Sequence, residues 1–144
     1  MTVIYLAMAL TETPELWHGQ FHFYVRRELE QIEDVTVTQF IGLKPDADES
    51  EVYKYDINLA KSADLMVALM RIPSFGVGQE IQSRGGMRKP KPTLLLHPKD
   101  QYLSRLCRGT PGTITREYNS GAQDGIRQAR QIACHVCDYL KSHR

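Results

Sequence analysis

The sequence predicts an α/β fold with a mainly parallel five-stranded sheet, and three observations support this prediction. Short apolar segments alternate with longer segments of helical periodicity along the chain. The segment DLMVALM at 64–70 is almost continuously apolar, as is typical of a strand covered on both faces. With 144 residues, 42% of them hydrophobic, the chain is long enough to bury a core. We therefore expect one domain over residues 1–144, built as a Rossmann- or flavodoxin-like three-layer sandwich.

The N-terminal half is predicted to alternate three strands with two helices. Apolar or alternating segments of strand length lie at 3–9, 35–40 and 64–70. Segments with apolar residues at helical spacing separate them, at 14–32 and 48–62. The apolar stripe predicted for the second helix contains Val52, Tyr55 and Leu59.

The C-terminal half continues the alternation. A short helix is predicted from near Gly78 to the Gly85–Gly86 pair, and the apolar segment TLLL at 93–96 is the next buried strand. The segment TITREY at 113–118 is predicted as an edge strand. Residues 121–141 have a clear helical period and form the last predicted helix.

Composition argues against several classes of protein. A formal net charge of +1, with acidic and basic residues mixed along the chain, gives no reason to expect nucleic acid or a membrane as partner. The three cysteines form no framework for disulfides, so a reducing compartment, the cytoplasm, is expected. The pair in CHVC at 134–137 lacks the second ligand pair of a zinc site, and we predict neither a metal nor an organic cofactor.

The segment that follows the strand at 64–70 is the main candidate for a functional site. In a parallel sheet, ligands bind outside the carboxyl ends of the strands, where this segment lies. Gly76 and Gly78 would let backbone amides turn outward at the start of a helix, and Ser74 adds a hydroxyl, a combination that suits a phosphate. Glu80 follows one turn later, where a carboxylate could simply complement the helix dipole or could be catalytic. These residues alone leave both interpretations open.

The longer segment YKYDINLAKSADLMVALMRIPSFGVGQEI resembles the core of the nucleoside 2-deoxyribosyltransferase superfamily, and is most similar to 2′-deoxynucleoside 5′-phosphate N-hydrolases. The resemblance covers about residues 52–109. It implies that Glu80 is the nucleophile at the anomeric carbon of the sugar. It also implies that Asp56 handles the nucleobase or its proton.

The same resemblance implies a phosphate site. The transferases have an aspartate six residues before the glutamate, whereas the N-hydrolases resemble this chain in having a serine, here Ser74. The phosphate would then bind to Ser74, Gly76 and Gly78. The segment LSRLCRG at 103–109 is similar to the hydrolase segment that supplies a serine to the neighbouring subunit's site, so Ser104 and a homodimer are implied.

The N-terminal segment departs from the family pattern. The hydrolases have a glycine- and arginine-containing turn after the first strand, whereas this chain has MALTET at 8–13, in which Thr11 and Thr13 could supply hydroxyls. An aromatic residue that orients the glutamate in the family would fall near Phe21, His22 or Tyr24. Thr11, His22 and also His97, which follows a strand at the ligand-facing edge, are therefore candidate substrate contacts.

The expected function is hydrolysis of the N-glycosidic bond of a nucleoside or deoxynucleoside 5′-monophosphate, without a cofactor and with only a small molecule as substrate. Three alternatives remain at this stage. They are a deoxyribosyltransferase that exchanges bases, a ribonucleotide N-hydrolase acting on cytidylate-type substrates, and a nucleotide-binding module without catalysis. The sequence does not distinguish ribose from 2′-deoxyribose.

Overall fold

A computed structural model describes residues 1–9, 15–42, 46–119 and 125–143, with the side chains of residues 15–19 left aside. Five strands form one sheet: β1 (Thr2–Met8), β2 (Val35–Thr38), β3 (Leu65–Leu69), β4 (Thr93–Pro98) and β5 (Thr113–Tyr118). Five helices lie between and after them: α1 (Glu15–Glu30), α2 (Glu49–Ser62), α3 (Phe75–Gly85), α4 (Arg105–Gly109) and α5 (Gly125–Ser142).

The strand order is β2-β1-β3-β4-β5, and every pairing is parallel. The predicted fold class, a three-layer sandwich around a parallel five-stranded sheet, is therefore confirmed, and β5 is the predicted edge strand. The order reverses between β1 and β3, which makes their carboxyl ends the topological switch point of the sheet. The connection from β3 to α3 begins there.

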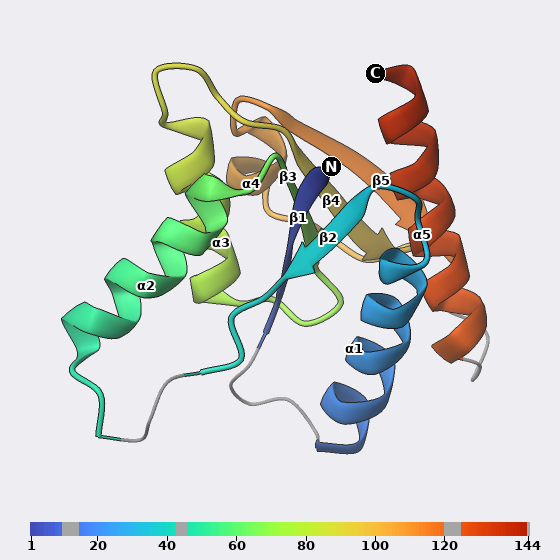
Figure 1. Ribbon diagram of the computed structural model, residues 1–144, viewed down its shortest axis with the longest axis horizontal. Helices are drawn as coiled ribbons and strands as arrows, with labels where there is room; N and C mark the ends of the chain where they lie inside the picture. Colours follow the sequence, from blue (N-terminus) through green and yellow to red (C-terminus); the bar gives the residue numbers. More distant parts are fainter. Residues whose placement is uncertain (10–14, 43–45, 120–124, 144) are drawn as a thin grey trace.

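The core has two layers, one on each face of the sheet (Figure 1). Alternate residues of each strand enter opposite layers, so that Ile4 and Leu6 of β1 pack toward α1 and α5, while Tyr5 and Ala7 pack toward α2 and α3. Only the second layer contains buried charged side chains, Glu80 and Arg84, among the residues that the structure describes. The two layers therefore differ in chemistry as well as in position.

Three predicted details are wrong. α3 begins at Phe75 instead of near Gly78, because Ser74 caps the helix by accepting a hydrogen bond from the amide of Val77 at 3.4 Å. The short helix α4 was not predicted; five residues are too few to show a helical period. In α2 the buried residues are Ile57 and Ala60, and Tyr55 of the predicted stripe is 51% exposed.

None of the helices among the described residues combines the length and the apolar character that a membrane span requires.

Candidate active site

Tyr5 projects from the middle of β1 into the layer under α2 and α3. Its phenol is almost fully buried, with 1% of the residue exposed. The hydroxyl contacts two carboxylates, Oδ1 of Asp56 on α2 and, at 2.8 Å, Oε1 of Glu80 on α3. One strand and two helices therefore bring together three oxygen-bearing side chains that are far apart in sequence.

The two contacts of the Tyr5 hydroxyl favour one proton at this cluster in addition to that of the tyrosine. The hydroxyl of Tyr5 has a single hydrogen and can donate it to only one carboxylate at a time. Its contact with the other carboxylate is a hydrogen bond only when that carboxyl is itself protonated and donates to the phenol oxygen. The geometry therefore favours one proton shared between Asp56 and Glu80.

The electrostatics of Glu80 agree with this count. Burial raises the pKa of Glu80, the negative charge and a hydrogen bond of Asp56 raise it further, and the hydrogen bond from Tyr5 lowers it, with a net pKa of about 9. Burial is also the largest reason that the pKa of Tyr5 lies far above its ordinary value. At neutral pH the phenol is therefore neutral, and the carboxyl pair retains a proton.

The two oxygens of Glu80 have different surroundings. Oε1 accepts the hydrogen bond from Tyr5, whereas Oε2 is buried and receives no hydrogen bond from any residue that the structure describes. Leaving a buried carboxylate oxygen without a donor is costly, so such an atom stands out in a folded protein. The side chain therefore has a hydrogen-bond donor at one oxygen and none among the described residues at the other.

The N-terminus of α3 lies next to this cluster along the same helix. Ser74 uses its side-chain oxygen to accept from the amide of Val77, and its own hydroxyl hydrogen stays available for a ligand. Six residues separate Ser74 from Glu80, about 9 Å of helix axis. Side chains on a helix lean toward its N-terminus, so Glu80 leans toward Gly76, four residues earlier.

Gly76 and Gly78 belong to the first turn of α3, and neither has a positive φ. Both glycines thus stand at the start of the helix, as predicted, in ordinary helical backbone. What they provide is space: a Cβ at Gly78 would meet no atom within 4 Å, and one at Gly76 would meet only the Ser74 oxygen, at 3.6 Å. The absence of side chains leaves the surface between Ser74 and Glu80 open.

Ser104 is exposed immediately before α4, and its side chain makes no capping hydrogen bond to that helix. It lies on a separate segment from Ser74. Within one chain, the structure does not show the two hydroxyls sharing a site.

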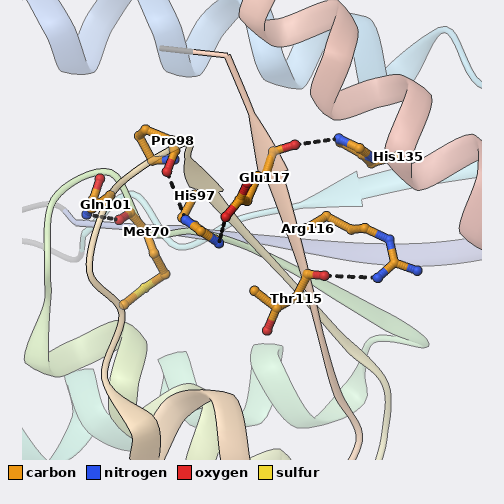
Figure 2. Close-up of polar contacts among 8 residues, drawn as sticks. All are labelled: Met70, His97, Pro98, Gln101, Thr115, Arg116, Glu117 and His135. Carbon is orange, nitrogen blue, oxygen red and sulfur yellow. Dashed lines mark hydrogen bonds and ion pairs between the residues drawn. The ribbon is translucent and has the colours of Figure 1, made fainter.

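His97 lies at the carboxyl end of β4 and is buried. Its Nδ1 contacts the carbonyl of Pro98 at 2.9 Å, and its Nε2 lies 4.0 Å from Glu117 on β5 (Figure 2). It lines a cavity of about 570 Å³ with Gln101, Arg108 and other residues. This lining does not include Tyr5, Asp56 or Glu80, so the structure does not bring His97 together with the carboxylate cluster.

The remaining sequence candidates lie elsewhere. The ring of His22 on α1 contacts the side chain of Gln39, beyond β2. Phe21 packs on the face of the sheet opposite Glu80, where it stacks on Tyr118. Thr11 and Thr13 lie outside the described residues. The aromatic side chain seen to contact Glu80 is Tyr5, not one from the segment at 21–24.

Two buried polar residues of this layer were missed in the sequence. Tyr5 was assigned only to an apolar strand, although its hydroxyl is the one side-chain polar group in VIYLAMA, which was a usable signal. Arg84 was not considered; its guanidinium donates to the carbonyls of Ala60, Ala63, Asp64 and Pro92. Nothing in the local sequence marks Arg84 as buried.

Among the described residues, no group of three or more histidine, cysteine, aspartate or glutamate side chains is arranged to hold a metal ion.

Solved structures share the fold. The Clostridium botulinum CMP N-glycosidase superposes with a TM-score of 0.67 at 18% identity, over 92% of this chain and 98% of that one. A 2-deoxyribosyltransferase from Bacillus psychrosaccharolyticus superposes with a TM-score of 0.55 at 21% identity, over 76% of this chain and 82% of that one. At such identities the likeness shows a common fold, and the chemistry must be argued from the site.

A likeness in sequence adds to the structural one. A Methanosarcina mazei protein named "Putative 2'-deoxynucleoside 5'-phosphate N-hydrolase 1" is 39% identical over 66 residues. The match covers 46% of this chain and 40% of that protein, so less than half of either takes part. No protein-family model matches the chain. The predicted resemblance to 2′-deoxynucleoside 5′-phosphate N-hydrolases is confirmed over the 66 matched residues.

Proposed function

We propose that this protein hydrolyses the N-glycosidic bond of a nucleoside or deoxynucleoside 5′-monophosphate and releases the free base and the sugar 5-phosphate. The observation that carries the proposal is the state of Glu80, a buried carboxyl group whose Oε1 is held by Tyr5 and whose Oε2 has no hydrogen-bond donor among the described residues. The names of the similar proteins, a CMP N-glycosidase, a 2-deoxyribosyltransferase and an N-hydrolase, agree with chemistry at this bond.

Glu80 acts as the nucleophile. Positive charge develops on C1′ and the ring oxygen as the bond to the base breaks, and an anionic oxygen beneath C1′ stabilises that charge. Oε2 then forms a covalent ester with C1′, and water hydrolyses this ester in a second step, as in retaining glycosidases. The hydrogen bond from Tyr5 to Oε1 keeps the carboxylate in position through both steps.

The shared proton serves the departing base. In the reactive form of the carboxyl pair the proton lies on Asp56 and Glu80 is ionised, so one group attacks while the other protonates the leaving base. Tyr5 contacts both carboxylates and can relay the proton between them. The reaction therefore needs the singly protonated pair, and the rate should fall above pH about 9, where that proton is lost.

The N-terminus of α3 binds the phosphate. The first amides of a helix lack internal partners and carry partial positive charge, which favours an anion. Ser74 adds a hydroxyl donor, and the open surface at Gly76 and Gly78 admits the phosphate and the sugar. Binding energy from this end of the substrate places C1′ over Glu80.

A homodimer completes the site. Ser104 is exposed at the start of α4, where it can reach the phosphate bound by a neighbouring copy. Tyr102 and Leu106, on the same segment, are 80% and 78% exposed, which suits a surface covered by a second subunit.

The decisive experiment is incubation of the purified protein with a panel of ribo- and deoxyribonucleoside 5′-monophosphates, each beside its unphosphorylated nucleoside. Chromatography should show release of free base from at least one monophosphate. Adding a second base without phosphate distinguishes hydrolysis from transfer, because a transferase would form a new nucleoside. Binding without base release would favour the nucleotide-binding module.

Ser74→Asp tests the phosphate site in the same panel. A carboxylate at the mouth of α3 repels a phosphate dianion but not an uncharged 5′-hydroxyl. We expect activity on monophosphates to fall and activity on nucleosides to be spared. Equal losses on both substrates would place the phosphate elsewhere.

A further inference from the structure

The β3–β4 ladder ends for a reason visible in the sequence. The amide of Met70 donates to the carbonyl of Leu96 at 2.8 Å, just beyond the pairing of Leu69 with Leu96. In a regular parallel ladder, the carbonyl of Met70 would then accept from the amide of residue 98. Residue 98 is Pro98, which has no N–H. The next hydrogen bond of the ladder cannot form.

Gln101 supplies a donor in place of this amide. Its Nε2 donates to the carbonyl of Met70 at 2.7 Å and to that of Arg71 at 3.0 Å. Figure 2 shows the side chain of Gln101 beside Met70. Gln101 is itself placed by a tight turn, since its amide donates to Pro98 and Asp100 has a φ of 67°.

We propose that Gln101 is a positioning residue for the phosphate end of the substrate, an inference that rests on the proposed function. By capping Met70 and Arg71, it holds the first residues of the connection that leads to Ser74 and the first amides of α3. The segment 70–74 is short, so a shift at its start moves its end. Gln101 itself contacts no reacting atom.

The effect should be confined to the phosphate. Glu80 is held independently by Tyr5 from β1, so loosening the segment 70–74 leaves the carboxylate cluster intact. Arg71 also donates to Gln128 on α5 at 3.2 Å, a second attachment that limits the disturbance. Loss of the Gln101 amide should therefore raise KM for the monophosphate without much change in kcat.

The variant Gln101→Met keeps the length of the side chain and removes the donor. We expect a KM for the monophosphate about tenfold above the parent value, with kcat little changed and kcat/KM for the unphosphorylated nucleoside the same. Titration with inorganic phosphate, followed by NMR at the amide of Gly76, should show a matching loss of affinity. Gln131→Met is the matched control, because Gln131 accepts a hydrogen bond from the amide of Asn119, away from this segment.

A second variant tests the cause. Pro98→Ala restores the missing amide, so the double variant Pro98→Ala/Gln101→Met should recover most of the parent KM and phosphate affinity. Parent-like values for Gln101→Met, equal effects on nucleoside and monophosphate, or no recovery in the double variant would each overturn the inference. A parent protein that neither releases base nor binds phosphate would instead refute the proposed function, and the inference with it.

Discussion

Helix α3 carries two buried charged side chains one turn apart, and their surroundings are opposite. Arg84 is 0% exposed, and its terminal nitrogens donate to four backbone carbonyls at the end of α2 and the starts of β3 and β4. Glu80 is 5% exposed, lies beside a second carboxylate, and has one oxygen that accepts no hydrogen bond from a described residue. Both terminal nitrogens of Arg84 donate to carbonyls, although its Nε has no hydrogen-bond partner among the described residues. Glu80 instead has a neighbouring carboxylate, and its Oε2 has no partner among the described residues.

We interpret the difference as one between a structural charge, Arg84, and the proposed nucleophile, Glu80. Arg84 satisfies carbonyls that end a helix and precede two strands, a favourable arrangement for a cation. Burial lowers the pKa of Arg84, to about 10, so it stays charged at neutral pH. Glu80 has no comparable set of hydrogen bonds in the free protein. Its raised pKa reflects the free-energy cost of ionising this buried carboxyl group. Such costs are expected where a group is kept ready for a substrate.

The largest expected effect is on turnover. Glu80→Gln removes the nucleophile, and we expect kcat to fall by at least about 10⁴-fold while monophosphate binding persists. Single-turnover assays with isothermal titration of the same protein measure both. Retention of the parent rate would end the assignment of Glu80.

The same variant should be more stable than the parent at neutral pH. The pKa of Glu80 rises from 4.5 to about 9 on folding, so the folded state binds a proton that the unfolded state releases between these values. The parent should therefore lose stability as pH rises through this window. Glu80→Gln should lack that dependence and be more stable by roughly 2 kcal/mol at pH 7, measured by urea unfolding.

Arg84→Met should have the opposite effects, a loss of stability with unchanged turnover. It leaves buried carbonyls at α2, β3 and β4 without a hydrogen-bond donor, and we expect a loss of about 3–5 kcal/mol in the free energy of unfolding. The folded fraction should keep the parent kcat, because Arg84 contacts none of the reacting groups. Denaturant titration, combined with a measurement of activity per folded molecule, tests this. An Arg84→Met variant that is stable but inactive would contradict the structural role assigned to Arg84.

Asp56→Asn should lower kcat by about 10²-fold, since the leaving base loses its acid. Removing the Asp56 charge and hydrogen bond also lowers the pKa of Glu80. The pH–rate profile should therefore lose its alkaline limb and keep an acid limb. An unchanged alkaline limb would show that the leaving base does not receive the proton shared by Asp56 and Glu80.

Among the three substitutions in the Tyr5, Asp56 and Glu80 cluster, Tyr5→Phe has the smallest expected effect, about tenfold on kcat. The hydrogen bond from Tyr5 lowers the pKa of Glu80, so its loss raises that pKa and moves the alkaline limb to higher pH. Asp56→Asn should thus remove the alkaline limb, whereas Tyr5→Phe should move it to higher pH. A shift to lower pH in Tyr5→Phe would contradict the proposed hydrogen-bond network.

Much of the fold could be predicted because its signals are local. The apolar segments at 64–70 and 93–96 mark strands whose pattern reflects burial on both faces of the sheet. Boundaries were less certain where caps decide them, as at Ser74. Tyr55 was placed in a buried stripe and is exposed, because periodicity does not say which neighbouring helix covers which face.

The sequence predicts only part of the candidate site. A motif indicates Glu80, Asp56 and Ser74, whereas the apolar segment around Tyr5 predicts only a strand. The proposed role of Gln101 depends on hydrogen bonds around Pro98 that the sequence does not show. Ser74 and Glu80 share one helix, so their spacing is local. Tyr5 reaches Glu80 from β1, which is distant from α3 in the sequence.

By itself, the sequence determined the alternation of strands and helices, and through it a parallel sheet with a candidate site at the carboxyl end of β3. Only the tertiary structure decided that residues 5, 56 and 80 meet in one buried cluster and that Arg84 donates to backbone carbonyls. The physical reason is that periodicity and capping are properties of neighbouring residues, whereas a pKa depends on burial and on charges that the fold brings from distant segments.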